Sequence, residues 1–596
     1  MIRTACPLDC YDACAMVCDP DRPDKPVALS GHPVGNGSLC ALMTKHIHKA
    51  SRIDAPMIDG NEVSMDEALD RVADILKASD SSLLWRGSGN LGVMQSVTDL
   101  LMEKTGGTLT FGSLCDAAGA FGIKEGRGVI KQLPPEQIAR AETVVVWGRN
   151  VPVTNSHLMR FIKGKRVIVI DPVRTSLARE ADLHLQIRPR TDFYLAILLA
   201  RFIIMEDSQN DEWLEKFAPD YEEFYDFTRS FRIKSILEHI GASLDDMGDM
   251  LRHMIGRRVV FIVGTGVQKY TIGHYVTWAI DSLAAILGLF GREGCGVSYL
   301  GNSRQGFSDP FRVETPRVSM VETPFEKFDC VIVQGGNPAE SMPNSDRVVR
   351  SLSRVKDLIY FGLYENATSR LANIVIPARS FMEKDDLRLS YGHSYVERMN
   401  RVYDGQRGIS EYMFVSGIFD RLGMDPLPSE KEIIESWVRQ CHEKDGHLLS
   451  PDHEDLPYSD GFGEEGGEEF VFIDDFEDYV EDSSRFRKLR PPREESTDLY
   501  RLITPKSPRS LNTQFFSGES FVRLHPSSGF VDGEIVTIYS DYGESSFVVR
   551  IDEDLREDIV SIYAGTPGVN ALTPSMSSEC GDNACFQDVE VRIRKE

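Results

Sequence analysis

Four short apolar runs constrain the fold of this chain more than any other feature of its 596 residues. They are residues 143–148, 166–171, 259–264 and 330–335. Each run is rich in β-branched residues and ends in a glycine or an aspartate, which is typical of parallel strands buried on both faces. Helical patterns lie between them, over 193–205 and 280–289. The sequence therefore predicts an α/β architecture, in which ligands bind beyond the carboxyl ends of the strands.

The chain is too long for one hydrophobic core and should form several domains. We predict a small N-terminal domain over 1–55, an α/β lobe over 128–299, a second α/β lobe from 56–127 with 300–490, and a C-terminal β-barrel over 498–596. The barrel is expected because apolar and polar residues alternate over 534–540 and 588–594. We interpret the acidic tract 442–482 as a solvated insertion in the second lobe, or alternatively as a docking site for a basic partner.

The charge and the apolar stretches exclude some partners. A formal net charge of -26 argues against nucleic acid and anionic membranes, since both need a positive protein surface. The most apolar stretches, 193–205 and 275–290, are interrupted by Arg201 and Asp281 and are shorter than a membrane span. No apolar targeting segment precedes Cys6. We expect a cytoplasmic protein without direct membrane insertion.

Four cysteines near the N-terminus can converge on one inorganic centre. Cys6, Cys10 and Cys14 follow at four-residue steps, and Cys40 comes after a segment that contains Pro and Gly. Three close thiols with one distant partner are typical of a 4Fe-4S cluster, whereas structural zinc sites usually pair their ligands in two doublets. Disulfides suit small secreted scaffolds better than a chain with 11 Cys in 596 residues. Cys18 keeps the same step and could compete as a ligand, although four ligands are already supplied.

Two similar turns follow strands in different parts of the chain: Trp-Gly-Arg-Asn at 147–150 and Gln-Gly-Gly-Asn at 334–337. Glycine lets backbone N–H groups approach a phosphate or a ring closely, and asparagine adds a donor and an acceptor. The pair suggests two similar ligand-binding lobes. Asp171 and Asp192 could accept hydrogen bonds from a ribose or a guanine edge, and helix N-capping explains them equally well.

In their order, these motifs resemble those of the molybdopterin oxidoreductases of the dimethyl sulfoxide reductase family. The resemblance is carried by the cysteine motif, Trp-Gly-x-Asn at 147–150, Ile-Asp-Pro-x-x-Thr at 170–175, Gly-Gly-Asn-Pro at 335–338 and Val-Asn-Ala-Leu-Thr at 569–573. It covers essentially the whole chain. Within the family, the segment 383–395 looks most like the branch that holds biotin sulfoxide reductase.

The resemblance implies a molybdenum or tungsten ion held by two molybdopterin guanine dinucleotides, with a 4Fe-4S cluster nearby to pass electrons. Each α/β lobe would bind one dinucleotide, and the barrel would cover both. The cofactor-binding positions that it implies are Trp147, Gly148, Asn150, Asp171, Thr175, Asp192 and Gly264 in one lobe, Gly335, Gly336, Asn337 and Glu365 in the other, and Leu511, Asn512, Thr513 and Asn570 in the barrel.

The resemblance also implies a protein ligand of the metal. The family supplies it from a loop before the first nucleotide lobe, where Cys115 is the matching residue and Ser113 is the alternative. A thiolate is a soft ligand that suits a metal already bound by dithiolenes. His393, with Tyr395, could face the substrate and donate protons or hydrogen bonds, and a structural role is the alternative.

Three departures from the family pattern bear on function. Formate dehydrogenases have a histidine after the metal ligand, but Asp116 stands here, which makes formate chemistry less expected. Many relatives have a basic residue within two positions of the fourth cluster cysteine, whereas no basic residue follows Cys40 until Lys45. Arg190 stands where the family usually has a glycine, and it could contact a phosphate or only occupy the turn.

We therefore expect a two-electron oxidoreductase that moves an oxygen atom or a hydride equivalent on a small substrate, such as an S-oxide, an N-oxide or a sulfur compound. The cofactor would carry the hard chemistry. An electron-transfer subunit or a soluble redox carrier is the expected partner. The alternatives are a formate dehydrogenase-like enzyme, a non-redox enzyme resembling acetylene hydratase, in which Asp9 or Asp12 would activate water, and a metal-free electron-transfer subunit resembling one of respiratory complex I.

Overall fold

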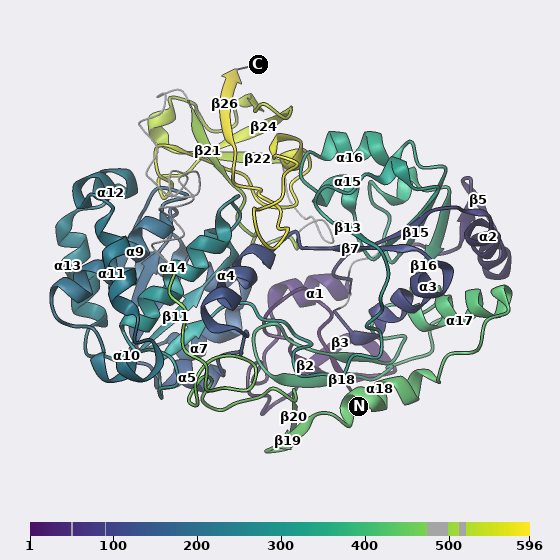
Figure 1. The fold of residues 1–596 in the computed structure, drawn as a ribbon. Coiled ribbons are helices and arrows are strands. Elements are labelled where there is room, and N and C mark those ends of the chain that lie inside the picture. The colour runs from purple at the N-terminus through teal and green to yellow at the C-terminus, as the bar shows by residue number, and fades with distance from the viewer. Residues whose placement is uncertain (49–51, 90, 474–498, 512–519, 596) are drawn as a thin grey trace.

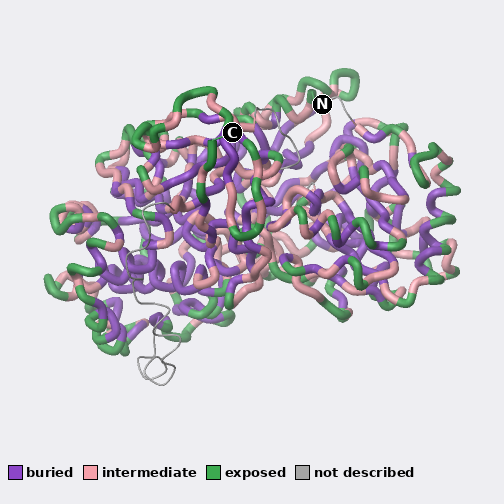
Figure 2. Tube along the Cα trace, turned by 90° about the horizontal axis from the view of Figure 1, so that it is seen from above, coloured by how far each residue is buried: buried purple, intermediate pink, exposed green. Residues whose placement is uncertain are grey.

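The computed structural model describes residues 1–48, 52–89, 91–473, 499–511 and 520–595. Two α/β lobes lie to the left and right in Figure 1, with a barrel above their junction and the N-terminal segment below it. The chain thus has the predicted class, a multidomain α/β protein with parallel sheets and a C-terminal barrel. Buried segments run through the interior of both lobes, and exposed segments gather at the periphery (Figure 2).

The first lobe is built on a parallel five-stranded sheet with the order β10-β9-β8-β11-β12. Its strands are β8 (Thr143–Trp147), β9 (Arg166–Ile170), β10 (Leu183–Leu185), β11 (Val259–Val263) and β12 (Gly296–Ser298). The predictions of strands over 143–148, 166–171 and 259–264 are confirmed. The order of strands reverses between β8 and β11, which is where open α/β sheets bind ligands.

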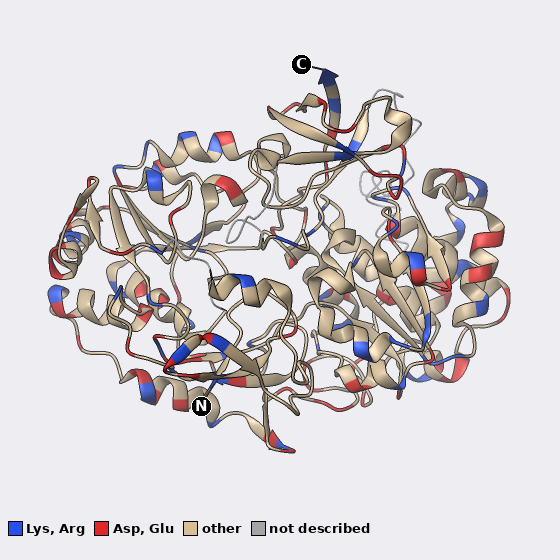
Figure 3. Cartoon of the chain, turned by 180° about the vertical axis from the view of Figure 1, so that it is seen from behind, with Lys and Arg blue, Asp and Glu red and all other residues tan. Residues whose placement is uncertain are grey.

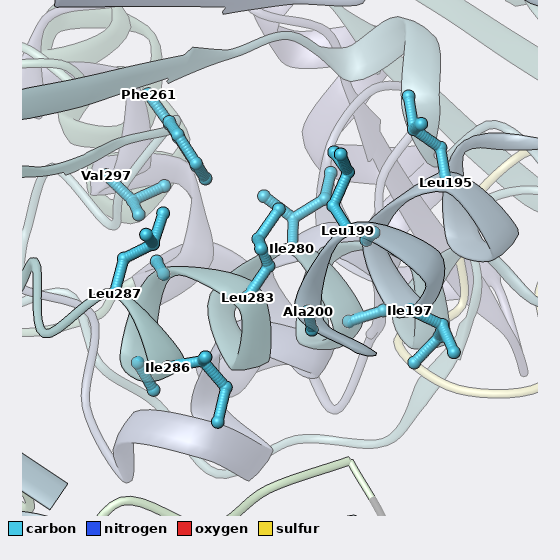
Figure 4. Close-up of a cluster of buried hydrophobic side chains, with 14 of the residues drawn as sticks. Leu195, Ile197, Leu199, Ala200, Phe261, Ile280, Leu283, Ile286, Leu287 and Val297 are labelled. Atoms are coloured by element: carbon cyan, nitrogen blue, oxygen red, sulfur yellow. The ribbon is translucent and has the colours of Figure 1, made fainter. Parts of the chain in front are cut away.

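Two apolar helices cover this sheet. Every residue of α14 (Gly273–Ile286) is buried, and α9 (Asp192–Met205) is apolar on nearly all sides. In Figure 4, Leu199 of α9 lies beside Ile280 and Leu283 of α14, close to Phe261 of β11. Each such buried side chain contributes about 1.5–3 kcal/mol. Burial against the sheet explains why both helices are apolar. Among the described residues, no helix is long and apolar enough to cross a membrane.

The second lobe is built on an eight-stranded sheet with the order β13-β7-β6-β14-β15-β16-β4-β5. Its strands are β4 (Met57–Ile58), β5 (Asn61–Glu62), β6 (Ser82–Arg86), β7 (Thr108–Phe111), β13 (Arg317–Ser319), β14 (Cys330–Gln334), β15 (Asp357–Gly362) and β16 (Ile374–Pro377). β14 pairs in parallel with β6, from before the first lobe, and with β15, from after it. The order reverses between β6 and β14, so the second lobe repeats the switch point of the first.

Helices cover both faces of the second sheet. Side chains of α2 (Met65–Ala78), α3 (Val97–Thr105) and α17 (Glu411–Leu422) form one core with it, and those of α16 (Ser345–Leu352) pack on the other side. Acidic and basic residues lie mainly on such outer helices and loops, while the strands are mostly uncharged (Figure 3). The charge of the chain is therefore carried at its periphery.

The N-terminal segment forms a three-stranded antiparallel sheet followed by one helix. Its elements are β1 (Ile2–Ala5), β2 (Ala15–Asp19), β3 (Arg22–Ala28) and α1 (Ala41–Ile47). It lies against a four-stranded sheet made of β17 (Asp386–Arg388), β18 (Tyr395–Met399), β19 (His442–Lys444) and β20 (His447–Leu449). The bidentate ion pair between Arg3 and Glu397 joins the two sheets.

The C-terminal barrel is closed in the order β21-β25-β22-β24-β23-β26. Its strands are β21 (Tyr500–Ile503), β22 (Phe521–Leu524), β23 (Ile535–Tyr539), β24 (Glu544–Ile551), β25 (Ile559–Ser561) and β26 (Glu590–Lys595). The alternation over 534–540 and 588–594 predicted β23 and β26. Closure leaves no strand edge exposed.

The acidic tract corrects one prediction. The hairpin of β19 and β20 is largely exposed, but Tyr458, Phe462, Phe470 and Phe472 are buried in the core of the first lobe. The glutamates at 464, 465, 468 and 469 are exposed, as a solvated tract requires. The interpretation of 442–482 as an insertion of the second lobe is nevertheless wrong for the aromatic residues of 458–473, which form an apolar face that packs into the first lobe. Residues 474–482 lie outside the described residues.

A buried ion pair fixes this tract to the first lobe. Arg127, at the end of α4 (Ala117–Arg127), donates from Nε to Asp281 of α14 at 2.7 Å. Its guanidinium also lies over the rings of Phe290 and Tyr458, at 4.6 and 5.5 Å from their centroids. Arg127 and Asp281 are each 1% exposed, so neither charge is solvated once the other is removed.

We expect Arg127→Ala to destabilise the protein by about 3–5 kcal/mol, because Asp281 would remain as an unpaired buried charge. The measurement is the melting temperature by differential scanning calorimetry. Arg140→Ala is the matched control: Arg140 pairs with Glu293, but these side chains are 53% and 63% exposed, so the cost should stay below about 1 kcal/mol. Equal losses in the two variants would contradict this account.

Candidate active site

A cavity of about 700 Å³ lies where the two lobes, the barrel and the N-terminal segment meet. Tyr11 of the N-terminal segment, Gly148 of the first lobe, Gly335 of the second lobe and Tyr563 of the barrel all line it. This volume lies within the range of cavities that hold small molecules and cofactors. The candidate site is thus built by the whole chain.

In the first lobe, the glycines that follow two neighbouring strands lie in close contact. We call such a contact a glycine crossing. Gly148, with φ +58°, follows β8, and Gly264 follows β11. A Cβ on Gly264 would lie 2.2 Å from the carbonyl oxygen of Gly148, so no side chain fits there. Nearby, the Oδ1 of Asn150 is buried at the cavity wall without a hydrogen-bond partner among the described residues. The crossing therefore offers bare backbone and a free acceptor to a ligand.

The second lobe repeats this arrangement. Gly87 follows β6, and Gly335, with φ +55°, follows β14. A Cβ on Gly87 would lie 2.5 Å from the carbonyl oxygen of Gly335. The indole Nε1 of Trp85, on the same wall, is buried and has no hydrogen-bond partner in the described part of the chain. Two equivalent crossings, one at each switch point, thus face one cavity.

The half-buried Asp171 and the buried Asp192 line the first lobe's part of the cavity. Burial raises the pKa of Asp171 to about 7 and that of Asp192 to about 6. The amide of Val173 donates to Asp171 at 2.8 Å, the indole of Trp147 donates to Asp192 at 2.7 Å, and both bonds oppose the effect of burial. Arg523 of the barrel lies on the same wall and favours ionised Asp171. This polar end suits the hydrogen-bonding edge of a base or a ribose.

The four N-terminal cysteines lie together behind the cavity wall. Burial raises the pKa of the Cys6 thiol to about 12 and those of Cys10 and Cys14 well above their usual range. Cys40 raises all three pKa values further, Cys6 also raises those of Cys10 and Cys14, and the Asp12 carboxylate contributes in each case. The pKa of Cys18 is raised to about 11 by burial alone. Cys6, Cys10, Cys14 and Cys40, here called the cysteine quartet, thus lie near enough to affect one another's pKa, as expected of the ligands of one cluster. Cys18, on β2, shows no such effect.

We expect Cys10→Ser to lose most of its bound iron and Cys18→Ser to retain it, because only the first thiol belongs to the quartet. The measurements are iron and acid-labile sulfide per chain, and the electron paramagnetic resonance signal of the reduced protein. Cys18→Ser is the matched control, because it makes the same substitution in the same N-terminal segment. Iron retained in Cys10→Ser, or lost equally in both, would contradict the assignment.

The loop after β7 carries Cys115 on the cavity wall. Its Sγ lies 3.2 Å from the Oγ of Ser113 and donates to Asp116 Oδ1 at 3.1 Å. Although the thiol is open to the cavity, it lies deep in the protein, and this desolvation, followed by the Asp116 carboxylate, raises its pKa well above its usual range. The side-chain amide of Gln268 donates to the Cys115 carbonyl and accepts from the amide of Gly119, which holds the loop in place.

Comparison with known proteins identifies the family. Residues 52–405 match the family described as Molybdopterin oxidoreductase, and residues 500–590 match the Molydopterin dinucleotide binding domain. This chain belongs to the molybdopterin oxidoreductase family. The resemblance found in the sequence is confirmed, and the chain is an enzyme of this family with a molybdopterin dinucleotide-binding domain.

Relatives of this molybdopterin oxidoreductase have several activities. The chain is 23% identical to the "Probable oxidoreductase YyaE" of Bacillus subtilis, over 100% of this chain and 99% of that protein. It is 21% identical to the dimethyl sulfoxide/trimethylamine N-oxide reductase of Rhodobacter capsulatus, over 72% of this chain and 64% of that protein. The solved structure of acetylene hydratase from Pelobacter acetylenicus has the same fold, with a TM-score of 0.73, 15% identity and full coverage of both chains.

Most of the positions that the family resemblance implied line the cavity: Cys115, Gly148, Asn150, Asp171, Thr175, Asp192, Gly264, Gly335, Gly336, Asn337 and Asn570. Trp147 lies behind them and supports Asp192. Two predictions are not supported: Glu365 is exposed on a loop, and Leu511 packs with the cysteine segment. Asn512 and Thr513 lie outside the described residues.

His393 is a further correction, because it does not line the cavity. Its Nε2 lies 3.1 Å from the carbonyl oxygen of Asp12, and its ring packs edge-on against Tyr11. Burial lowers its pKa to about 3, so the ring stays neutral. Tyr395 also turns away and donates to Glu136 at 2.8 Å. His393 therefore supports the cysteine segment, and the prediction that it faces the substrate is wrong.

Two of the departures from the family pattern receive a structural explanation. Arg190 has φ +71° and pairs with Asp588 at 2.6 Å, so it occupies the turn and joins it to the C-terminal segment. Lys45 is exposed on α1 and does not line the cavity. It therefore does not replace a basic residue between the cysteine quartet and the cavity.

The cavity wall also holds basic and aromatic residues that the sequence did not single out, among them Arg149, Lys269 and Tyr391. Burial lowers the pKa of Lys269 to about 8, while the nearby Cys115 opposes this effect. Its signal in the sequence is its place five residues after Gly264, at the end of a predicted strand. Arg149 belongs to the Trp-Gly-Arg-Asn turn, and nothing in the local sequence indicates that its side chain is buried at the cavity.

Proposed function

We propose that this chain is a molybdenum- or tungsten-dependent oxidoreductase that carries two molybdopterin guanine dinucleotides and a 4Fe-4S cluster. It would transfer an oxygen atom or a hydride equivalent, with two electrons, on a small substrate such as an S-oxide, an N-oxide or a sulfur compound. The observation that carries the proposal is the pair of equivalent glycine crossings that meet in one cavity with Cys115 on its wall. Relatives that reduce dimethyl sulfoxide, trimethylamine N-oxide or nitrate support this reaction class.

The residues on the wall fit such a cofactor. The first crossing, with Asn150 and the carboxylates Asp171 and Asp192, would hold one dinucleotide, and the second crossing would hold the other. When bound, the metal-pterin group supplies the two-electron chemistry. Cys115 would ligate the metal, and its neutral thiol would lose its proton to do so, since a metal ion ionises a coordinating thiol outright.

Other residues of the wall would orient the substrate. Gln268 fixes the Cys115 loop, and Lys269 places a positive charge near Cys115, where it can hold a polar oxygen of a substrate. The cysteine quartet, on the other side of Tyr11, would exchange single electrons with an electron-transfer subunit or a soluble carrier.

Metal and pterin analysis of anaerobically purified protein tests the proposal. We expect about one molybdenum or tungsten, two pterins and four iron atoms per chain. Protein that folds and is purified without any pterin would refute the proposal. It would also favour the alternative of a metal-free electron-transfer subunit.

A hydratase is the second candidate function, and one observation favours it. Asp9, next to Cys10, lines the cavity and raises the pKa of Cys115, so a carboxylate is available to activate water. Asp12 does not share this role, because it is buried and accepts a hydrogen bond from the backbone of His157. Turnover that needs neither an electron donor nor an acceptor would establish the hydratase. Formate dehydrogenase activity is less expected, because Asp116 stands where formate dehydrogenases have a histidine after the metal ligand.

A further inference from the structure

Arg149 is a buried cation that forms no ion pair with any described residue. It is 6% exposed, and it lines the cavity directly after the first glycine crossing. Its Nη1 donates to the carbonyl oxygen of Val263 at 3.2 Å and its Nε to Asn155 Oδ1 at 3.3 Å. Its guanidinium lies 5.2 Å from the centroid of the Tyr11 ring. Within the described residues, no carboxylate forms an ion pair with it.

Such a charge is costly unless a further group compensates it. Burying an ionised side chain without a counter-charge costs several kcal/mol, and an arginine keeps its proton rather than become neutral. Burial lowers the pKa of Arg149, and the groups that oppose this effect are Tyr11, Tyr391, Asp12 and Cys10, in that order. The Asp12 carboxylate does not form an ion pair with Arg149, and its Oδ2 lies 2.6 Å from the ring Nδ1 of His157. Because no carboxylate pairs with it directly, Arg149 can still stabilise an additional anion that is not part of the polypeptide.

The cysteine quartet supplies a place for that anion. Cys10 lies close behind the cavity wall, because its neighbours Asp9 and Tyr11 both line the wall. Its Sγ lies 3.4 Å from the carbonyl oxygen of Thr154, which also lines the wall. Cys10 is among the groups that act on the pKa of Arg149. Arg149 thus lies on the side of the cavity that adjoins Cys10.

Two other basic residues near the quartet do not take this position. Lys45, the nearest in sequence to Cys40, is exposed on α1. Arg388 is buried, but its nitrogens are engaged by the carbonyl oxygens of Cys6, Leu8, Cys10 and Leu389. Arg388 therefore holds the cysteine loop in shape and does not face the cavity.

We propose that Arg149 is a positioning residue that raises the reduction potential of a 4Fe-4S cluster bound by the cysteine quartet. The inference rests on the proposed function, because it requires the cluster. Reduction adds one electron, and with it one negative charge, to the cluster. A fixed positive charge beside Cys10 stabilises the reduced form more than the oxidised form, because the Coulomb attraction grows with the added charge in a poorly solvated interior.

The test is a potentiometric titration of the anaerobic protein, with dithionite as the reductant, followed by the electron paramagnetic resonance signal of the reduced cluster. In Arg149→Gln we expect the ratio of reduced to oxidised cluster at a fixed potential to fall about tenfold, a shift of about 59 mV for one electron. Arg149→Lys keeps the charge and should change the ratio less than about threefold. Lys45→Gln removes a charge near Cys40 at the surface and should leave the ratio unchanged.

A midpoint potential in Arg149→Gln equal to that of the wild type, with iron content intact, would overturn the proposal. An equal shift in Arg149→Lys would also overturn it, since charge would then not be the cause. Arg149→Met is a second neutral variant for the case that the glutamine variant does not retain its cluster. A wild-type protein without iron is a different result, which counts against the proposed function itself.

Discussion

Cys115→Ala is expected to abolish turnover while leaving the fold intact. The contacts of the Cys115 thiol, with Ser113 and Asp116, lie within its own loop, and Gln268 holds that loop through the main chain, which the variant keeps. Removing groups that only support a metal ligand typically costs 10–100-fold in activity or metal affinity, so loss of the ligand should exceed about 100-fold. The measurement is reduction of an S-oxide or an N-oxide with a reduced viologen as the electron donor.

Ser113→Ala is the matched control, because Ser113 is the alternative ligand in the same loop. We expect this variant to keep the metal spectrum of the wild type, since its hydroxyl serves the loop by accepting from the amides of Cys115 and Asp116. X-ray absorption at the metal edge distinguishes a sulfur ligand from an oxygen ligand. An unchanged spectrum in Cys115→Ala, with a changed one in Ser113→Ala, would assign the serine as the ligand.

The strands and the barrel could be predicted from the sequence because their signals are local. Buried parallel strands show as apolar runs, and β23 and β26 show as alternation, whatever else the chain does. The place of each glycine after a strand was also visible. That Gly148 touches Gly264, more than 100 residues away, depends on the pairing of β8 with β11, and no local pattern contains that pairing.

The predictions that failed depended on packing rather than on local pattern. The acidic tract has the composition of a solvated segment, and this composition does not reveal that Phe462, Phe470 and Phe472 are buried against the first lobe. The motif around His393 resembled a site, but the direction of its ring is set by Tyr11, which is distant in sequence. The position of Arg149 beside the cysteine segment cannot be predicted locally either, since only the fold brings Tyr11 against its turn.

The last prediction concerns the glycine crossings that define the proposed cofactor site. Gly264→Ala should lower the pterin and metal content to less than about a tenth of the wild type. Its Cβ would lie 2.2 Å from the carbonyl oxygen of Gly148 and 2.7 Å from the Cβ of Arg149. Backbone cannot move aside as the tip of a side chain can, so the crossing must open and displace the first lobe's wall. Gly87→Ala should have the same effect from the second lobe, because its Cβ would meet the carbonyl oxygen of Gly335 at 2.5 Å.

The control for these variants is Gly248→Ala. Gly248 lies in α13 (Leu244–Met254), and its Cβ would contact only the Nη1 of Arg252, at 3.5 Å. Alanine favours a helix over glycine by about 1 kcal/mol, so this variant should keep its full pterin content and lose no stability. Pterin and metal content are measured per folded chain. If Gly264→Ala and Gly87→Ala carried as much pterin as Gly248→Ala, the two crossings would not be the walls of the dinucleotide sites. The hypothesis that this cavity holds two pterins would then lose its main support.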